Sequence, residues 1–154
     1  MPNPSTHKSI LGFDFGLKQI GVAYGQTLTN TSKALSIIKA TDGVPNWDQL
    51  SVLYNEWQPN LFVVGLPLNM DDSESELSLL ARKFAQRLKE RFKTEVIMMD
   101  ERLTSREIKA LLREDANNAN GKRKVNDPTK IDHLAAALIL QNWLDNPHLG
   151  QTIP

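Results

Sequence analysis

The sequence contains no cysteine among its 154 residues. This absence excludes disulfide bonds, thiol nucleophiles and cysteine-ligated zinc. Also missing is any apolar run close to the ~20 residues that a membrane-spanning helix needs. The first nine residues are polar and include two prolines, so they do not have the apolar core of a secretory signal. We therefore expect a cytoplasmic protein that has no contact with a membrane.

An excess of charge of either sign is absent too. Eighteen Lys and Arg residues balance eighteen Asp and Glu residues, which gives a formal net charge of zero. Nucleic-acid-binding proteins usually carry a basic excess, so the overall charge argues against such a partner unless the basic residues are clustered. The densest cluster is Lys122, Arg123 and Lys124, followed by Lys130. A solvated loop explains this cluster equally well.

Length and composition fit one globular domain. The chain is 40% hydrophobic and 23% charged, and no internal repeat or low-complexity segment interrupts it. We expect a single domain over residues 1–154, with an ordered core at about 10–145 and short flexible tails.

The spacing of apolar residues predicts a sheet with helices on its faces. Strands are expected at residues 10–15, 20–25, 33–39, 61–66 and 95–100. A helix should follow Asn46 as its cap, and two others should follow the capping boxes Ser73/Glu76 and Thr104/Glu107. A loop is expected at 115–127 and a last helix at 128–144. The order of three strands, a helix, a strand, a helix, a strand and then one or two helices indicates a mixed α/β sheet of five strands.

Asp14 is a carboxylate within an otherwise apolar strand. Side chains alternate along a strand, so Asp14 shares one face with Ile10 and Gly12. Burial of an unpaired charge is costly, and such a group is normally paired, hydrogen-bonded or bound to a metal ion. An Asp at the end of a strand that caps the turn before Gly16 is the alternative.

Two more acidic positions complete a candidate site. Asp100 and Glu101 end the last apolar strand, and because neighbours face opposite sides, at most one of them shares the face of Asp14. Asp132 lies in the first turn of the last helix, where Ala135 and Ala136 would allow a close approach to the sheet. The alternative for Asp132 is a favourable charge near a helix N-terminus.

Three such carboxylates suit Mg²⁺ or Mn²⁺, which prefer oxygen ligands. A pair of ions would activate a water molecule and stabilise the departing oxygen of a phosphodiester, so that no general-base histidine is required. His7 and His148 lie in the tails, and His133 points away from Asp132 on the helix. We expect all three to be non-catalytic.

Four segments together resemble one protein family. They are GFDFGLKQIGVAYG (12–25), VVGLPLN (63–69), DERLTS (100–105) and DHLAAALIL (132–140). Their order and spacing are similar to those of the YqgF family, also called RuvX, which comprises bacterial proteins described as pre-16S rRNA nucleases and earlier as Holliday junction resolvases. The resemblance covers nearly the whole chain.

The resemblance implies an RNase H-like fold and a nuclease with two divalent ions. The acidic positions that it carries over are Asp14, Glu101 and Asp132, with Asp100 as the second choice for the middle one. It implies a precursor of 16S rRNA as the substrate, with a DNA junction as the alternative and a ribosomal particle as a further partner. The protein would be a monomer or a homodimer, and a dimer would favour paired cuts on a symmetric junction.

The sequence departs from the family pattern at one position. Gln19 stands where the family usually has arginine, so Lys18 would have to take over a contact with nucleic acid. Arg102 is expected to bind a phosphate, although pairing with a neighbouring carboxylate is as good an interpretation. Asn69 is expected to contact the substrate, with an ordinary turn residue as the alternative.

Two other classes of function remain open. In a non-catalytic ribosome- or nucleic-acid-associated factor, the three acids would form only a structural polar cluster. In an actin-like ATPase, the GFDFG segment would bind phosphate, but that architecture needs two lobes and this chain has the length of one.

Overall fold

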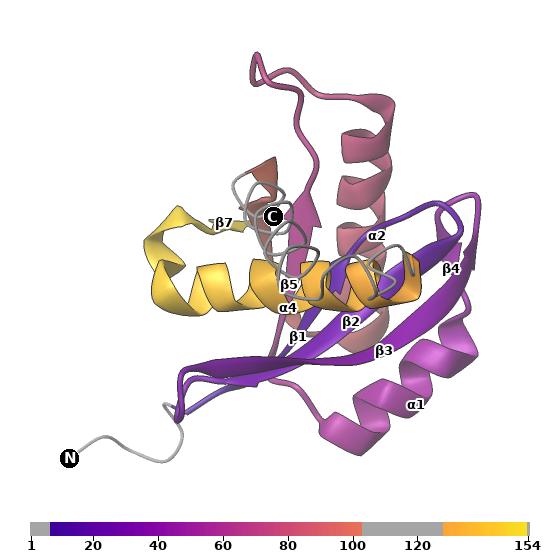
Figure 1. Cartoon of the computed structure of the whole chain (residues 1–154). Coiled ribbons are helices and arrows are strands. Elements are labelled where there is room, and N and C mark those ends of the chain that lie inside the picture. Colours follow the sequence, from indigo (N-terminus) through magenta and orange to yellow (C-terminus); the bar gives the residue numbers. More distant parts are fainter. Residues whose placement is uncertain (1–6, 103–127, 154) are drawn as a thin grey trace, which may run out of the picture.

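The computed structural model describes residues 7–102 and 128–153, and for residues 128–133 it describes only the course of the backbone. Seven strands form one sheet, with helices on both of its faces (Figure 1). The strands are β1 (Ser9–Asp14), β2 (Gln19–Gln26), β3 (Thr31–Thr41), β4 (Val44–Pro45), β5 (Leu61–Leu66), β6 (Glu95–Asp100) and β7 (Gln151–Thr152). The helices are α1 (Trp47–Trp57), α2 (Glu76–Phe92), α4 (Pro128–Asp145) and the short 3₁₀ helix η2 (Pro147–Leu149).

The sheet is mixed, with the strand order β4-β3-β2-β1-β5-β6-β7. β1, β5 and β6 run parallel to one another, whereas β2, β3, β4 and β7 each pair antiparallel with their neighbours. The five expected strands are all present, so the mixed α/β prediction is confirmed. The count of five is wrong, because β4 and β7 are two-residue strands, too short to show an alternating pattern.

The extra strand β4 arises from a tight hairpin. Asp42 and Gly43 have φ values of 50° and 83°, and they join Thr41 to Val44 directly. Asp-Gly is the dipeptide preferred in two-residue hairpins, because both residues of such a turn need a positive φ. This signal was present in the sequence although the strand that follows it is short.

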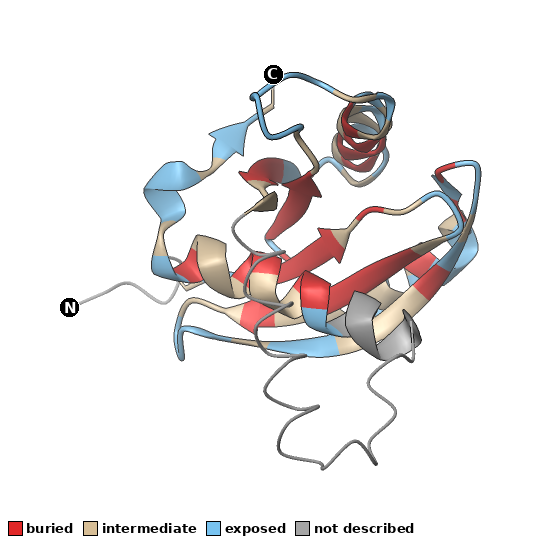
Figure 2. Ribbon diagram, turned by 45° about the horizontal axis from the view of Figure 1, so that its top comes forward, coloured by how far each residue is buried: buried red, intermediate tan, exposed pale blue. Residues whose placement is uncertain are grey.

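The two faces of the sheet pack against different helices. On one face, alternate strand residues such as Leu11, Phe13 and Val64 form a large core with Leu50 of α1 and Phe84 of α2. On the other face, a smaller set packs against Ala136, Ile139 and Leu140 of α4: Ile10, Ala23, Leu61, Val63, Ile97 and Met99. Figure 2 shows the buried residues concentrated in the central strands and on the side of α4 that faces them.

The helix starts confirm one cap and correct another. Asn46 caps α1, since its side chain accepts hydrogen bonds from the backbone N–H groups of Asp48 and Gln49. The expected Ser73/Glu76 capping box is wrong, because Ser75 and Ser78 form the box that begins α2. A serine at N3 can replace Glu in this arrangement, which is why the pattern placed the cap two residues too early. The Thr104/Glu107 helix and the 115–127 loop lie outside the described residues.

The C-terminal segment is packed against the sheet and α2. Its strand β7 pairs with β6, and Lys89 of α2 donates a hydrogen bond to the backbone oxygen of Ile153 at 3.0 Å. A two-residue strand and hydrogen bonds between residues far apart in the sequence leave no periodic signal. In the described part of the chain, no helix is both long and apolar enough to cross a membrane.

Candidate active site

The end of β1 places Asp14 on the face of the sheet that α4 covers. Gly12, two residues earlier, faces α4 so closely that a Cβ atom there would lie 2.8 Å from Cβ of Leu140. Asp14 points to the same side by alternation, is partly buried, and pairs across the sheet with Gly21 of β2. The backbone of β1 thus places Asp14 on the face of the sheet that α4 covers.

Gly65 of β5 brings Glu101 to the same face. A Cβ atom on Gly65 would lie 2.6 Å from Cδ1 of Ile139 in α4 and 2.7 Å from Oε2 of Glu101. Phe13 pairs with Val64, so one residue further along the parallel strands Gly65 becomes the neighbour of Asp14. Asp14 and Glu101 thus lie on either side of Gly65, at the carboxyl edge of three parallel strands and on the face of α4.

The carboxyl group of Glu101 is strongly perturbed by its surroundings. Its Oε2 is buried and has no hydrogen-bond partner among the described residues. Burial raises the pKa of Glu101 to about 7, and the negative charge of Asp100 contributes in the same direction. A carboxyl oxygen in this state is a functional candidate, because burial without a partner gives nothing to stability.

Asp100 lies on the other face of β6 and is paired. It is the register partner of Leu66, whose side chain belongs to the core beneath α1 and α2. Nε of Arg102 donates to both oxygens of Asp100, at 2.9 and 3.0 Å, and these hydrogen bonds lower the pKa of Asp100. Of the two neighbouring acids, Glu101 is therefore the one that shares the face of Asp14.

Arg102 fastens the loop after β5 to the end of β6. Besides Asp100, its guanidinium contacts Oδ1 of Asp72 at 2.7 Å and the backbone oxygen of Asn69 at 3.0 Å. The side chain of Asn69 in turn donates to Oγ of Ser73 at 3.0 Å. For both residues the structure shows the alternative interpretation left open by the sequence. Arg102 pairs with neighbouring carboxylates, and Asn69 is a turn residue.

The other expected nucleic-acid-binding residues are not brought to this edge by any described contact. Lys18 is exposed in the turn before β2, and its backbone oxygen accepts a hydrogen bond from Ala40. Gln19 begins β2 and shares the face of Gly21 at the same end of the sheet as Asp14. The cluster Lys122, Arg123 and Lys124 lies outside the described residues, as do the side chains of Lys130 and Asp132.

Asp132 is placed by the backbone of α4. It lies one turn before Ala136, which is fully buried against the sheet. Among the residues with described side chains, no three acidic or histidine groups form a metal-binding cluster. The joint action of Asp14, Glu101 and Asp132 therefore stays a prediction.

Sequence reasoning missed Gly65, although a signal existed. A glycine inside an apolar strand marks a bulge or a close approach by another part of the chain. Here the approach comes from Ile139 and Glu101 together, so the missing side chain leaves the space in which the buried carboxyl group lies.

Substitution of Gly65 should separate this role from simple packing. We expect Gly65→Ala to lower the free energy of unfolding by about 1–3 kcal/mol, because the new methyl group overlaps Ile139, and to displace Glu101. Gly25→Ala is the matched control, since its methyl group would meet Leu140 at 2.8 Å without touching Glu101. Urea denaturation and activity assays should show that both variants lose stability but only Gly65→Ala loses activity. Equal activities of the two variants would contradict this role.

Comparison with known proteins places the chain among nucleic-acid enzymes. Residues 8–146 match a family model described as "RuvX: Holliday junction resolvase". A protein from Aeromonas salmonicida is 50% identical over 141 residues, which are 92% of this chain and 97% of the relative. One from Acinetobacter baylyi is 44% identical over 147 residues, which are 96% and 97% of the two chains. Both relatives carry the name "Putative pre-16S rRNA nuclease".

Solved structures show the same fold. The chain resembles RuvC of T. thermophilus in complex with a Holliday junction substrate, with a TM-score of 0.54 and 15% identity over 94% of this chain and 99% of RuvC. A second Thermus thermophilus RuvC structure gives a TM-score of 0.53 at 11% identity, with the same shares covered. The fold is thus of the RuvC type, which confirms the RNase H-like α/β class predicted from the sequence.

Proposed function

The chain belongs to the RuvX family, and from this premise we propose that it is a nuclease that hydrolyses phosphodiester bonds at the 5′ end of precursor 16S rRNA. Relatives named for that activity align over at least nine-tenths of the chain. The observation that carries the chemistry is the buried, unpartnered Oε2 of Glu101 on the face of Asp14. The proposed substrate places the protein in the bacterial cytoplasm.

The residues at this edge fit divalent metal ions. Oε2 of Glu101 is a buried oxygen without a hydrogen-bond donor among the described groups, and a cation would supply the missing partner. Carboxylate oxygens are the ligands that Mg²⁺ and Mn²⁺ prefer, so Asp14, Glu101 and Asp132 would hold one or two such ions. A bound ion supplies Lewis acidity toward the phosphate and lowers the pKa of an attacking water molecule.

The protein's own groups prepare the site for this chemistry. The buried side chain of Ile139 of α4 and Oε2 of Glu101 both lie against Gly65. Arg102 anchors the end of β6 through Asp100, which fixes the backbone next to Glu101. His7 precedes β1, at the opposite end of that strand from Asp14, and His148 is exposed in η2. Neither histidine is placed to act as a general base.

A second candidate, resolution of DNA four-way junctions, is favoured by the family description and the RuvC-like fold. The same carboxylates would serve both reactions, and substrate shape would decide between them. Paired cuts on a junction would need a homodimer, whereas processing of a ribosomal precursor requires only a monomer.

Cleavage assays distinguish these functions. A 5′-leader RNA of precursor 16S rRNA and a four-way DNA junction are incubated separately with the protein in Mg²⁺, in Mn²⁺ and in EDTA. We expect metal-dependent cutting of the RNA. Cutting of the junction alone would favour the resolvase. If the folded protein cuts neither substrate, even with a precursor ribosomal particle present, the proposed chemistry is wrong and a non-catalytic ribosome-associated factor is favoured.

A further inference from the structure

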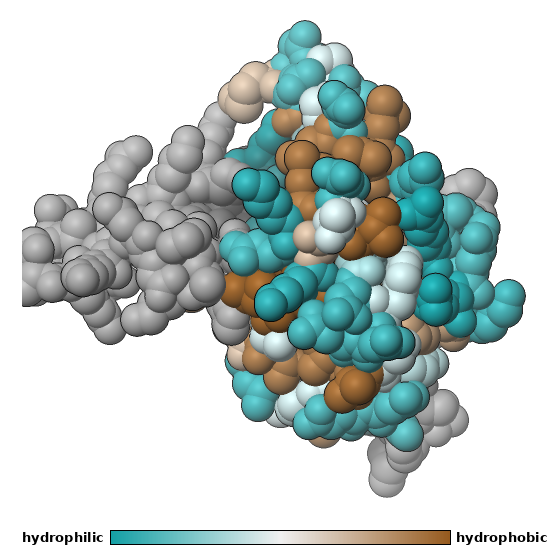
Figure 3. Space-filling model, turned by 90° about the vertical axis from the view of Figure 1, so that its right-hand side faces the viewer, coloured by the Kyte–Doolittle hydropathy of each residue, from teal (hydrophilic) through white to brown (hydrophobic). Residues whose placement is uncertain are grey.

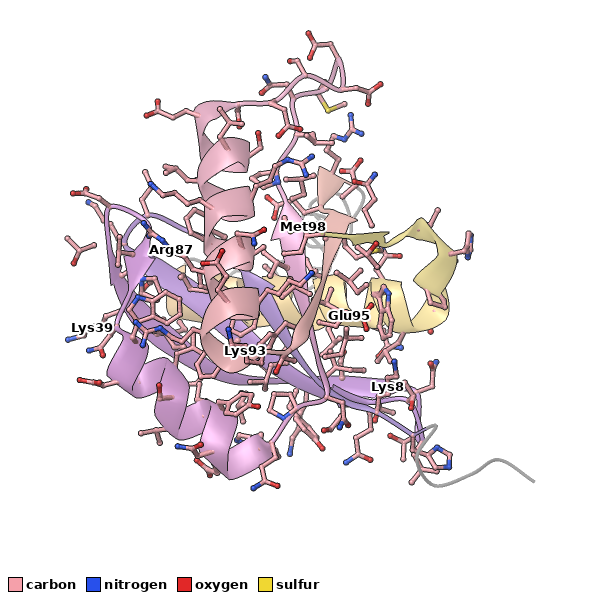
Figure 4. All side chains as sticks on the ribbon, turned by 180° about the vertical axis from the view of Figure 1, so that it is seen from behind. Lys8, Lys39, Arg87, Lys93, Glu95 and Met98 are labelled. Atoms are coloured by element: carbon pink, nitrogen blue, oxygen red, sulfur yellow. The ribbon has the colours of Figure 1, made fainter. Side chains whose placement is uncertain are left out.

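Helix α2 concentrates positive charge in a chain whose net charge is zero. Six basic residues and only one acidic residue lie between positions 82 and 93: Arg82, Lys83, Arg87, Lys89, Arg91 and Lys93, with Glu90. This helix covers the face of the sheet opposite α4, as Figure 4 shows from behind. Helix α2 therefore carries the clustered positive charge that a nucleic-acid partner requires. The cluster expected from the sequence was a different one, at residues 122–124.

Part of this charge is not used by the fold. Arg82 pairs with Glu74 at 2.7 Å, and Lys89 is hydrogen-bonded to the backbone oxygen of Ile153. Lys83, Arg87 and Lys93, by contrast, form no ion pair with an acidic side chain in the described ranges. Unpaired cations on one helix repel one another, so clustering them does not stabilise the fold. Such a cluster favours the binding of an anionic partner.

The basic residues form a regular row beside an aromatic ring. Lys83, Arg87 and Arg91 recur every four residues, which places them on one edge of α2 with a rise of about 6 Å between successive members. The guanidinium of Arg91 lies over the ring of Trp47, with Cζ 4.3 Å from the ring centroid. Trp47 in turn packs on Phe84, with the centroids 6.4 Å apart and the rings nearly parallel. The Trp47 ring thus contacts the flat face of the Arg91 guanidinium. The N–H groups at the edge of the guanidinium are left available for a bidentate contact with a phosphate.

Two hollows flank this row. One, of about 410 Å³, is lined by Trp47, Arg87, Glu90 and Arg91. The other, of about 470 Å³, is lined by Gln86, Lys89, Glu90, Lys93, Thr94 and Glu95. Glu90 lies between them and accepts a hydrogen bond from Gln86 at 3.2 Å. Figure 4 shows Arg87 and Lys93 on this side of the molecule, with Lys39 beyond the edge of α2.

We propose that the basic row of α2, defined as Lys83, Arg87 and Arg91 together with Lys93 and Trp47, is a second RNA-binding surface that contacts phosphates away from the scissile bond. The proposal rests on the function proposed above and adds to it how the substrate is held. The carboxylates lie on the face of α4, so an RNA strand bound to α2 is a distant part of a long substrate.

Charge complementarity favours RNA as the partner. A row of cations at a repeat near the spacing of successive phosphates matches a polyanion. A stable protein partner would instead require a continuous apolar centre in the contact surface. Figure 3 shows the side of the molecule that carries β4, where hydrophilic side chains dominate and hydrophobic ones form separate patches.

The test measures RNA binding separately from cleavage. Fluorescence anisotropy in EDTA records the affinity of the full chain for the 5′-leader RNA at several salt concentrations. Lys83→Gln/Arg87→Gln removes two charges that lack described ion pairs. As the matched control, Lys8→Gln/Lys33→Gln removes two exposed charges outside α2, of which Lys33 lies over the ring of Trp57. We expect about tenfold weaker binding and a salt slope lower by roughly 1.4 for the α2 variant. The control should bind like the wild type.

Failure of this proposal is distinguishable from failure of the proposed function. If the α2 variant folds normally by circular dichroism and binds RNA with the wild-type affinity and salt slope, the surface is not an RNA site and an acidic protein partner is favoured. The surface is likewise not an RNA site if the control variant loses as much RNA affinity as the α2 variant, or if the wild type does not bind the RNA. If the α2 variant binds RNA more weakly than the wild type but the wild type cuts no substrate, the surface is supported and the nuclease function is overturned. If the wild type is active, the wild type and the α2 variant should cleave equally well a short RNA that spans only the cleavage site.

Discussion

Asp14→Asn should reduce metal-dependent cleavage by about a thousandfold or more while leaving the fold intact. Asp14 is the carboxylate of β1 that faces α4, and it lies next to Gly65 in register, with Glu101 on the other side of Gly65. Loss of one carboxylate from a divalent-metal site removes several kcal/mol of transition-state stabilisation, and each 1.36 kcal/mol corresponds to about tenfold in rate. Single-turnover cleavage of the 5′-leader RNA in Mg²⁺ measures the effect.

Asp48→Asn is the matched control for this substitution. Asp48 is an exposed carboxylate in the first turn of α1, on the other side of the sheet, so its loss should change the rate less than twofold. Thermal melts of both variants should stay close to that of the wild type. A fully active Asp14→Asn protein, or equal losses in the two variants, would show that Asp14 is only a strand-end turn residue.

The sequence predicted the central part of the fold because its strands have strong patterns. β5 and β6 are apolar on both faces and were placed to the residue, since each is buried under helices on both sides. The ends of the sheet were harder. β7 has two exposed residues and depends on backbone pairing with β6, which no side-chain periodicity reports.

The sequence predicted the candidate site except for the choice between Asp100 and Glu101, which requires the three-dimensional structure. Alternation along β1 gave the orientation of Asp14, and it showed that Asp100 and Glu101 could not both face it. The contact between Glu101 and Gly65 identifies which of them does. The pairing of Arg102 with Asp72 joins residues thirty positions apart, so it depends on how the loop after β5 folds back. Local sequence patterns cannot supply a contact of that range.

The buried acid of the site should make stability depend on pH in an unusual direction. The pKa of Glu101 is about 7 in the folded protein and 4.5 in its ordinary state. Between these values the folded protein holds a proton that the unfolded chain has lost, so its free energy of unfolding falls as the pH rises. The loss is complete above pH 7 and amounts to about 3 kcal/mol, which is the shift converted at 1.36 kcal/mol per pH unit.

Glu101→Gln should therefore be more stable than the wild type at pH 8 in EDTA, and equally stable at pH 4. Roughly 3 kcal/mol corresponds to a higher melting temperature by about 6–12 °C for a chain of this size. Urea denaturation at both pH values measures the difference. Asp100→Asn is the contrasting control, because the hydrogen bonds from Arg102 lower the pKa of Asp100 and its charge stabilises the fold above its ordinary pKa. That variant should be less stable at pH 8.

Metal ions should reverse the wild-type penalty, because they bind the ionised carboxylate. Addition of Mg²⁺ or Mn²⁺ at pH 8 should raise the melting temperature of the wild type and of Asp100→Asn, but not that of Glu101→Gln. The same stabilisation in Glu101→Gln would mean that another group binds the ion. If Glu101→Gln kept the wild-type pH dependence in EDTA, the carboxyl group would not be buried as an isolated charge. Agreement on both counts would identify Glu101, rather than Asp100, as the acid that binds the metal at the end of β6.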